Sequence, residues 1–323
     1  MRIVRASAPG KCILFGEHAV VYGYPAIAAA ISLKSTCIIE ELSESKIELI
    51  LKNFNQSYKF EDLNDLFKKI PPQLEQIKYL FKIINQQYNT QIEKVKITIF
   101  SNLFPSSGLG SSASIAVALV MAFNTYLNLK LEKTEISKIA FEMERIIHGT
   151  PSGIDNTICT FGKLIFFQGH KFRYLEAPQD FDILVTYSNM DHDTKLAIDQ
   201  LRGLKNEEPL FCDFIFDKIR FYTELAELEI NQGNLNEIGK LMNINQKLLA
   251  SLNLSNDSIT EIVNVANENG AYGSKLTGAG LGGCVITIGN DDILEEISQI
   301  LNKKGYKSLI ANIDKEGAII EKH

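Results

Sequence analysis

The chain has 323 residues, a little over twice the usual single-domain length of about 150, so two packed domains are expected. Hydrophobic residues at 45% and charged residues at 22% exclude a disordered or fibrous chain. The net charge of −6, without a long run of Lys or Arg, argues against a nucleic-acid partner. No apolar run approaches the ~18 residues that a membrane span needs.

The first third of the chain is predicted to be mainly β-structure, with a helix over residues 73–87. Strands are expected in three segments where β-branched residues cluster or alternate, namely 35–41, 46–51 and 94–100. A Gly/Ser-rich loop over 101–110 then leads into a helix of small residues over 111–127.

A second helix is expected over residues 135–148 with Thr134 as its N-cap, followed by a turn-rich loop over 149–156. Further strands are expected over 163–167, 182–187 and 284–288, with two short strands at the end of the chain. From residue 194 helical periodicity dominates, over 195–204, 209–232, 235–251, 257–269 and 293–303. This order predicts an α+β protein with domains at 1–180 and 181–323.

The cysteines favour a reducing compartment. Their number is odd and no two have a Cys-x-x-Cys spacing, which argues against a disulfide framework or a zinc site. The first ten residues also lack the apolar core of a signal peptide. A cytoplasmic protein with free thiols is therefore expected.

Four segments have the composition of functional loops. The first, residues 8–23, places Lys11 beside a Pro-Gly pair and sets Glu17 and His18 inside an apolar run. Taken alone, this segment is better explained by a plain strand-turn-strand with a solvated lysine and a polar turn. The segment over residues 144–156 sets Glu144 and His148 four apart on one helix face, followed by Asp155 after a Pro-Ser-Gly turn. A solvated turn is the alternative there.

The other two segments are rich in glycine. One lies between a predicted strand and a predicted helix and reads Pro105-Ser106-Ser107-Gly108-Leu109-Gly110-Ser111-Ser112-Ala113. Glycines allow backbone N–H groups to face inward, and the helix N-terminus adds further donors, so this segment predicts a phosphate site. It is not a P-loop, because no Gly-Lys-Ser/Thr follows. The other segment, residues 275–284, has four glycines within six residues, which indicates a close backbone approach.

Taken together, the four segments resemble the motifs of the GHMP kinase superfamily, which includes galactokinases and homoserine, mevalonate and phosphomevalonate kinases. The match extends over residues 8–284. The segments Gly16-Glu17-His18-Ala19-Val20-Val21-Tyr22-Gly23 and 144–156 resemble those of mevalonate kinases of the compact archaeal and bacterial type. This resemblance implies two domains with the active site in the cleft between them. It also implies transfer of the γ-phosphoryl group of ATP to the 5-hydroxyl of mevalonate, with Mg²⁺.

The resemblance also assigns roles to single residues. Asp155 falls on the catalytic carboxylate, and Lys11 falls on the lysine that contacts it and the phosphate. Ser112 and Glu144 fall on the Mg²⁺ ligands, and the segment 105–113 falls on the ATP phosphate loop. A set of further residues is expected near the substrate: Glu17, His18, Thr194, Gly278, Ala279 and Gly280.

The substrate carboxylate has no assigned clamp. Animal enzymes of the family have an arginine near the position of His192, and its absence leaves open whether His192, Thr194 or Lys195 replaces it. Since ATP and mevalonate are both anions, the net charge of −6 offers no steering, and local groups must capture them. The sequence leaves the oligomeric state open, and the family resemblance allows a homodimer, since dimers are common in the family.

Two other functions stay open. One is another GHMP small-molecule kinase, acting on phosphomevalonate or on mevalonate at another hydroxyl; an extra phosphate on the substrate would require additional basic residues. The other is a non-catalytic nucleotide-binding module, from which the loss of Lys11, Glu144 or Asp155 would be expected. All three are present.

Overall fold

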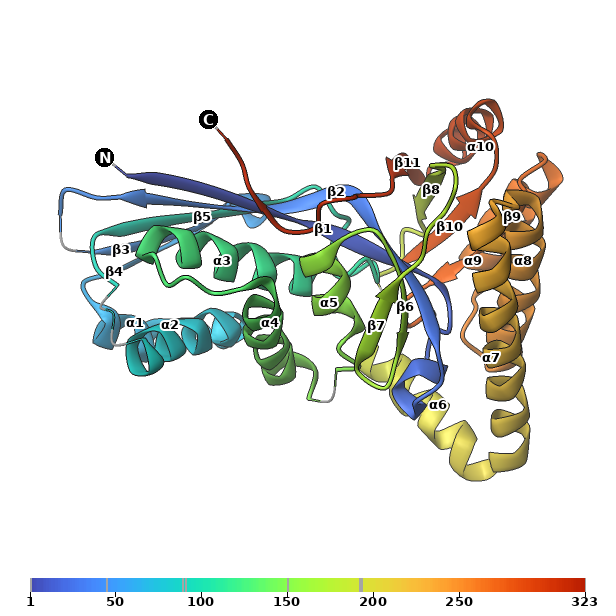
Figure 1. Cartoon of the computed structure of the whole chain (residues 1–323), viewed down its shortest axis with the longest axis horizontal. Helices are drawn as coiled ribbons and strands as arrows, with labels where there is room; N and C mark the ends of the chain where they lie inside the picture. The colour runs from blue at the N-terminus through green and yellow to red at the C-terminus, as the bar shows by residue number, and fades with distance from the viewer. Residues whose placement is uncertain are drawn as a thin grey trace.

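The structure is a computed structural model that describes residues 2–44, 46–88, 90, 92–149, 151–191 and 194–322, apart from the side chain of His148 (Figure 1). Its strands form one eight-stranded and one four-stranded sheet, each covered by helices. The α+β class predicted from the sequence is confirmed. No helix in the described ranges combines the length and apolar character needed to cross a membrane.

The eight-stranded sheet has the order β12-β1-β2-β5-β3-β4, and β6 and β7 extend it from β2. Neighbouring strands run antiparallel except for the parallel pair β3 and β5. The strands are β1 (Ile3–Phe15), β2 (Ala26–Glu41), β3 (Ile47–Leu51), β4 (Gln56–Phe60), β5 (Val95–Ser101), β6 (Leu164–Gln168), β7 (Lys171–Tyr174) and β12 (Ile319–Ile320).

Five helices lie along one face of this sheet (Figure 1). They are α1 (Leu63–Lys69), α2 (Glu75–Gln87), α3 (Ser111–Leu127), α4 (Lys133–His148) and α5 (Ile154–Phe161). Helix α3 packs on β1 and β2. Small side chains such as Ala113 and Ala116 are fully buried there and allow the helix to approach the sheet closely. Short 3₁₀ helices lie at Ala19–Tyr22, Lys52–Phe54 and Pro72–Leu74.

The four-stranded sheet has the order β11-β8-β10-β9 and is entirely antiparallel. Its strands are β8 (Asp182–Tyr187), β9 (Gly273–Thr277), β10 (Cys284–Ile288) and β11 (Lys307–Asn312). Every residue of β9 and β10 is buried. Helices α8 and α9 pack on β9, and α10 packs on β8 and β11. The helices are α6 (Thr194–Glu207), α7 (Pro209–Gln232), α8 (Leu235–Ser251), α9 (Asp257–Glu268) and α10 (Asp291–Lys303).

Two local predictions are wrong. The N-cap of α4 is Glu132, not Thr134, because the Glu132 and Glu135 side chains form a reciprocal capping box. The loop predicted over 149–156 ends earlier, since α5 begins at Ile154 after Gly153 with φ +85°. Asp155 therefore lies in the first turn of a helix, which fixes its position more tightly than a loop would.

The two ends of the chain meet in the large sheet, because β12 pairs with β1. The large sheet thus takes strands from residues 3–174 and again from 319–320, while the small sheet takes its strands from 182–312. The division at residue 180 stays a prediction.

Candidate active site

A cavity of about 1050 Å³ is lined by residues from both units of the fold. Its wall includes Lys11 from β1, the loop before α3, Glu144 from α4 and Asp155 from α5. Gly278 and Ala279, which follow β9, contribute to the wall from the other unit.

The loop before α3 has the geometry of an anion site. Gly108 and Gly110 have φ +78° and +69°, a region that favours glycine, and α3 begins directly after Gly110. A Cβ on Gly110 would lie 2.9 Å from Lys11 Cγ, and one on Gly108 would lie 2.9 Å from the carbonyl oxygen of Thr277. The unpaired N–H groups at the start of this 17-residue helix supply further donors at the cavity.

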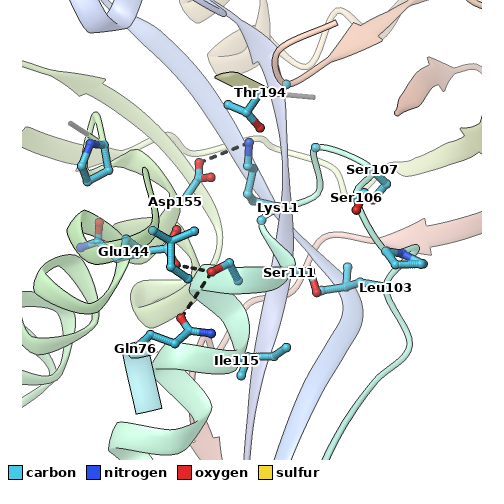
Figure 2. A pocket seen from close by; sticks show the side chains of 18 of the residues that line it. Lys11, Gln76, Leu103, Ser106, Ser107, Ser111, Ile115, Glu144, Asp155 and Thr194 are labelled. Carbon is cyan, nitrogen blue, oxygen red and sulfur yellow. Dashed lines mark hydrogen bonds and ion pairs between the residues drawn. The ribbon is translucent and has the colours of Figure 1, made fainter. Parts of the chain in front are cut away.

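Lys11 and Asp155 form an ion pair in the cavity, with Lys11 Nζ 3.2 Å from Asp155 Oδ1 (Figure 2). The lysine side chain is 4% exposed, whereas the aspartate is 35% exposed and open to a ligand. Within the described residues, Lys11 is the one lysine or arginine that lines the cavity. Its backbone N–H donates to the carbonyl oxygen of Leu109 at 2.9 Å, which ties β1 to the glycine loop.

Three oxygen-bearing side chains converge beside this pair. Ser112 Oγ donates to Glu144 Oε1 at 2.5 Å and lies 3.5 Å from Gln76 Oε1. Figure 2 labels the Glu144 and Gln76 side chains. Glu144 is 4% exposed. Burial raises the pKa of its carboxyl to about 7, helped by the nearby charge of Asp155 and opposed by the Ser112 hydrogen bond. A buried carboxylate and two neutral oxygens match the hard donors that Mg²⁺ prefers.

Leu51, Ile99 and Ile115 give the cavity an apolar part of its lining, called here the apolar end, and Asn53 lines the cavity as well. Leu51 and Ile99 are partners on the neighbouring strands β3 and β5. The Asn53 amide donates to the carbonyl oxygen of Ser101 and accepts from its N–H, both at 2.7 Å, so this wall is held in place.

The structure brings most of the predicted residues together. The cavity lining includes Lys11, His18, Pro105, Ser106, Ser107, Gly108, Gly110, Ser111, Ser112, Glu144, Asp155, Thr194, Gly278 and Ala279. His18 also donates from Nε2 to the carbonyl oxygen of Ala279 at 2.9 Å. His192 lies outside the described residues.

Four predicted residues do not line the cavity formed by the described part of the chain. Leu109 and Ala113 are fully buried in the hydrophobic cores. Gly280 turns toward Leu254, whose carbonyl oxygen would lie 2.3 Å from an added Cβ. Glu17 is fully buried and forms an ion pair with Lys275, so it faces the protein interior rather than the cavity.

Sequence reasoning missed Gln76 and Lys275. Gln76 lies in α2, where the apolar period draws attention to its neighbours instead. The sequence carries a signal for Lys275. This lysine lies between Gly273 and the apolar strand Cys284–Ile288, in a segment where a charged side chain has little access to solvent. A buried lysine requires a partner, and Glu17 is that partner.

The comparisons with known proteins agree with this geometry. Family models described as "GHMP kinases N terminal domain" and "GHMP kinases C terminal" match residues 75–163 and 225–307. A mevalonate kinase of Pyrococcus furiosus is 32% identical over 99% of this chain and 99% of its own. The chain belongs to the mevalonate kinase family of GHMP kinases.

Solved structures of this family share the fold. The mevalonate kinase of Methanococcus jannaschii is 33% identical, with a TM-score of 0.86 over 97% of this chain and 98% of that one. An L. major mevalonate kinase in complex with R-mevalonate is 27% identical, with a TM-score of 0.82 over 96% and 95% of the two chains. The two-domain GHMP kinase fold predicted from the sequence is confirmed.

Proposed function

We propose that this mevalonate kinase family member transfers the γ-phosphoryl group of ATP to the 5-hydroxyl of (R)-mevalonate, giving 5-phosphomevalonate and ADP. The observation that carries the proposal is the Lys11–Asp155 ion pair, which stands beside the glycine loop that precedes α3. Phosphoryl transfer needs an anion cradle, a positioned hydroxyl and charge neutralisation, and these groups supply all three.

ATP is proposed to lie along the cavity with its base at the apolar end and its phosphates at the glycine loop. Leu51, Ile99 and Ile115 offer the apolar surface that a purine ring requires. The phosphates would accept hydrogen bonds from the N–H groups of residues 108–112 at the positive end of α3.

Ser112 and Glu144 are proposed to hold Mg²⁺. The described residues contain no cluster of three acidic, histidine or cysteine side chains suited to a metal. This fits Mg²⁺, which usually takes one or two carboxylates together with substrate phosphates and water. When bound, the ion neutralises charge on the phosphates. Burial raises the pKa of Glu144 to about 7, so this carboxyl is partly protonated near neutral pH. It must lose that proton to act as a ligand.

Mevalonate is proposed to lie on the side of Asp155 opposite the apolar end, against His18, Thr194 and Ala279. Asp155 would orient the 5-hydroxyl and accept its proton as the oxygen–phosphorus bond forms and the bond to ADP breaks. Lys11, held at 3.2 Å from Asp155, would stabilise charge on the transferring oxygens.

The alternative acceptor, phosphomevalonate, carries a second phosphate. With one lysine and no arginine in the described cavity lining, the site offers little to balance that charge.

The cysteines of the described chain are all buried and unpaired, which supports the proposal of a cytoplasmic enzyme. The homodimer stays a prediction.

A coupled assay of ADP release over mevalonate, phosphomevalonate, homoserine and galactose tests this function. Mevalonate is expected to support turnover and the other three are expected not to. Faster turnover with another acceptor would reassign the substrate, and ATP binding without release of ADP to any acceptor would indicate a non-catalytic module.

A further inference from the structure

The Glu17–Lys275 ion pair is the most deeply buried charged contact in the described structure, with both side chains fully inaccessible. Glu17 lies in the turn after β1 and Lys275 in β9, so the pair joins the two units of the fold. Lys275 Nζ also donates to the carbonyl oxygens of Leu276 at 2.6 Å and Ile13 at 3.4 Å. Neither member of the pair lines the cavity.

Each member of the pair is close in sequence to a residue that does line the cavity. His18 directly follows Glu17, and Ala279 lies four residues after Lys275. His18 and Ala279 contact each other at 2.9 Å, so the two segments are bridged twice, once in the interior and once at the cavity wall.

The turn that carries Glu17 and His18 adopts an unusual backbone. Gly16 has φ +93°, and a Cβ there would lie 2.4 Å from the carbonyl oxygen of Pro25. His18 has φ +61°, a strained conformation for a non-glycine residue. Such a conformation persists only where the surrounding structure holds it in place. The ion pair immediately before it supplies such a restraint.

A second contact holds the same segments together. Thr277 Oγ1 accepts from the N–H of Ile13 at 2.8 Å and donates to its carbonyl oxygen at 3.2 Å. This contact secures β9 against β1, but it does not reach the turn at His18. The turn has its own backbone hydrogen bonds, from Ala19 N–H to Glu17 and from Val20 N–H to Gly16, and Asn245 donates to Glu17 Oε2 at 3.5 Å. The ion pair is the contact that ties the Glu17 side chain to β9.

We propose that Glu17 and Lys275 are positioning residues for the phosphoryl acceptor: their buried ion pair fixes His18 and Ala279 in the cavity wall. The proposal rests on the proposed function, and it assigns the two residues no contact with substrate. It differs from the expectation from family resemblance, in which Glu17 lies beside the substrate. Burial raises the pKa of Glu17 and lowers that of Lys275, so each residue depends on the other to stay charged.

The test compares Lys275→Met, Glu17→Gln and the double variant, all in the full chain. Glu17→Gln leaves Lys275 buried without its counter-ion and should lose stability and activity. Lys275→Met leaves a buried carboxylate without its partner and should lose stability as well as activity. The double variant removes both charges and is expected to regain stability but not activity, because the buried ion pair that fixes the turn at His18 is gone, although the Thr277–Ile13 and His18–Ala279 contacts remain.

The expected kinetic result is specific to the acceptor. In the double variant, KM for mevalonate should rise about tenfold and kcat should fall about 100-fold, the scale of a displacement of about 1 Å at a catalytic site. The Kd for ATP, measured by calorimetry, should stay within about twofold, because the glycine loop is held by β1 and α3.

Lys34→Met is the matched control. Lys34, in β2, pairs at 2.7 Å with Asp314, which lies in the segment between β11 and β12, and neither residue lines the cavity. Lys34→Met should lower the melting temperature without changing KM for mevalonate. A folded double variant with wild-type kcat and KM would overturn the positioning role and leave the proposed function standing. The same conclusion would follow if KM for mevalonate rose as much in Lys34→Met as in the double variant. Wild-type protein that releases no ADP with mevalonate would overturn both.

Discussion

Glu144 gives a prediction about stability that needs no ligand. Burial raises its pKa from 4.5 to about 7, so the folded chain favours the protonated carboxyl more than the unfolded chain does. The contribution of this group to stability is therefore fully present below about pH 4.5 and is lost as the pH rises toward 7. Since each pKa unit corresponds to 1.36 kcal/mol, the loss approaches about 3 kcal/mol at pH 8.

Glu144→Gln removes this loss, because an amide has no proton to release and can still accept from Ser112. In buffer with EDTA, the variant should gain stability over wild type by about 2–3 kcal/mol between pH 5 and pH 8. Urea unfolding of both proteins at the two pH values measures the gain, with other ionisable groups cancelling in the comparison. Glu142→Gln, on the exposed side of the same helix, controls for the general loss of a carboxylate. A stability difference for Glu144→Gln that is the same at both pH values would refute the reasoning.

Three further predictions concern the loaded site. Glu144→Ala should raise the Mg²⁺ concentration needed for half-maximal rate at least about tenfold, and an unchanged Mg²⁺ titration would remove Glu144 from the ligands. In the wild type that Mg²⁺ requirement should fall as pH rises from about 6 to 8, because metal binding displaces the Glu144 proton; a flat profile would contradict this. Gly110→Ala should weaken ATP binding, since its Cβ would lie 2.9 Å from Lys11 Cγ at φ +69°; calorimetry showing wild-type affinity would count against the proposed phosphate site.

The parts of the site that lie close together in sequence could be predicted without the structure. Gly108 and Gly110 precede a helix of small residues, and this pattern alone indicates an anion cradle. Glu144 and Asp155 belong to one segment, and the cavity contains both of them. Local sequence encodes loop and helix chemistry, so these features can be read from it.

The partnerships across the fold could not be predicted in the same way. Glu17 and Lys275 are 258 residues apart, and only the packing of β9 near the end of β1 brings them together. Glu17 and His18 are adjacent polar residues, and the sequence does not show which of them faces the cavity. In the structure Glu17 is buried in the interior, whereas His18 lines the cavity. The backbone of this turn has positive φ at both Gly16 and His18, a conformation that the sequence permits but does not dictate.

Asp155→Asn tests the central claim most directly. Asparagine keeps the size of the side chain but cannot accept a proton from the 5-hydroxyl or pair with the charge of Lys11. Mevalonate-dependent ADP release should fall at least about 1000-fold while the Kd for ATP stays close to wild type. A variant that turns over mevalonate at a near-normal rate would contradict the account of the site.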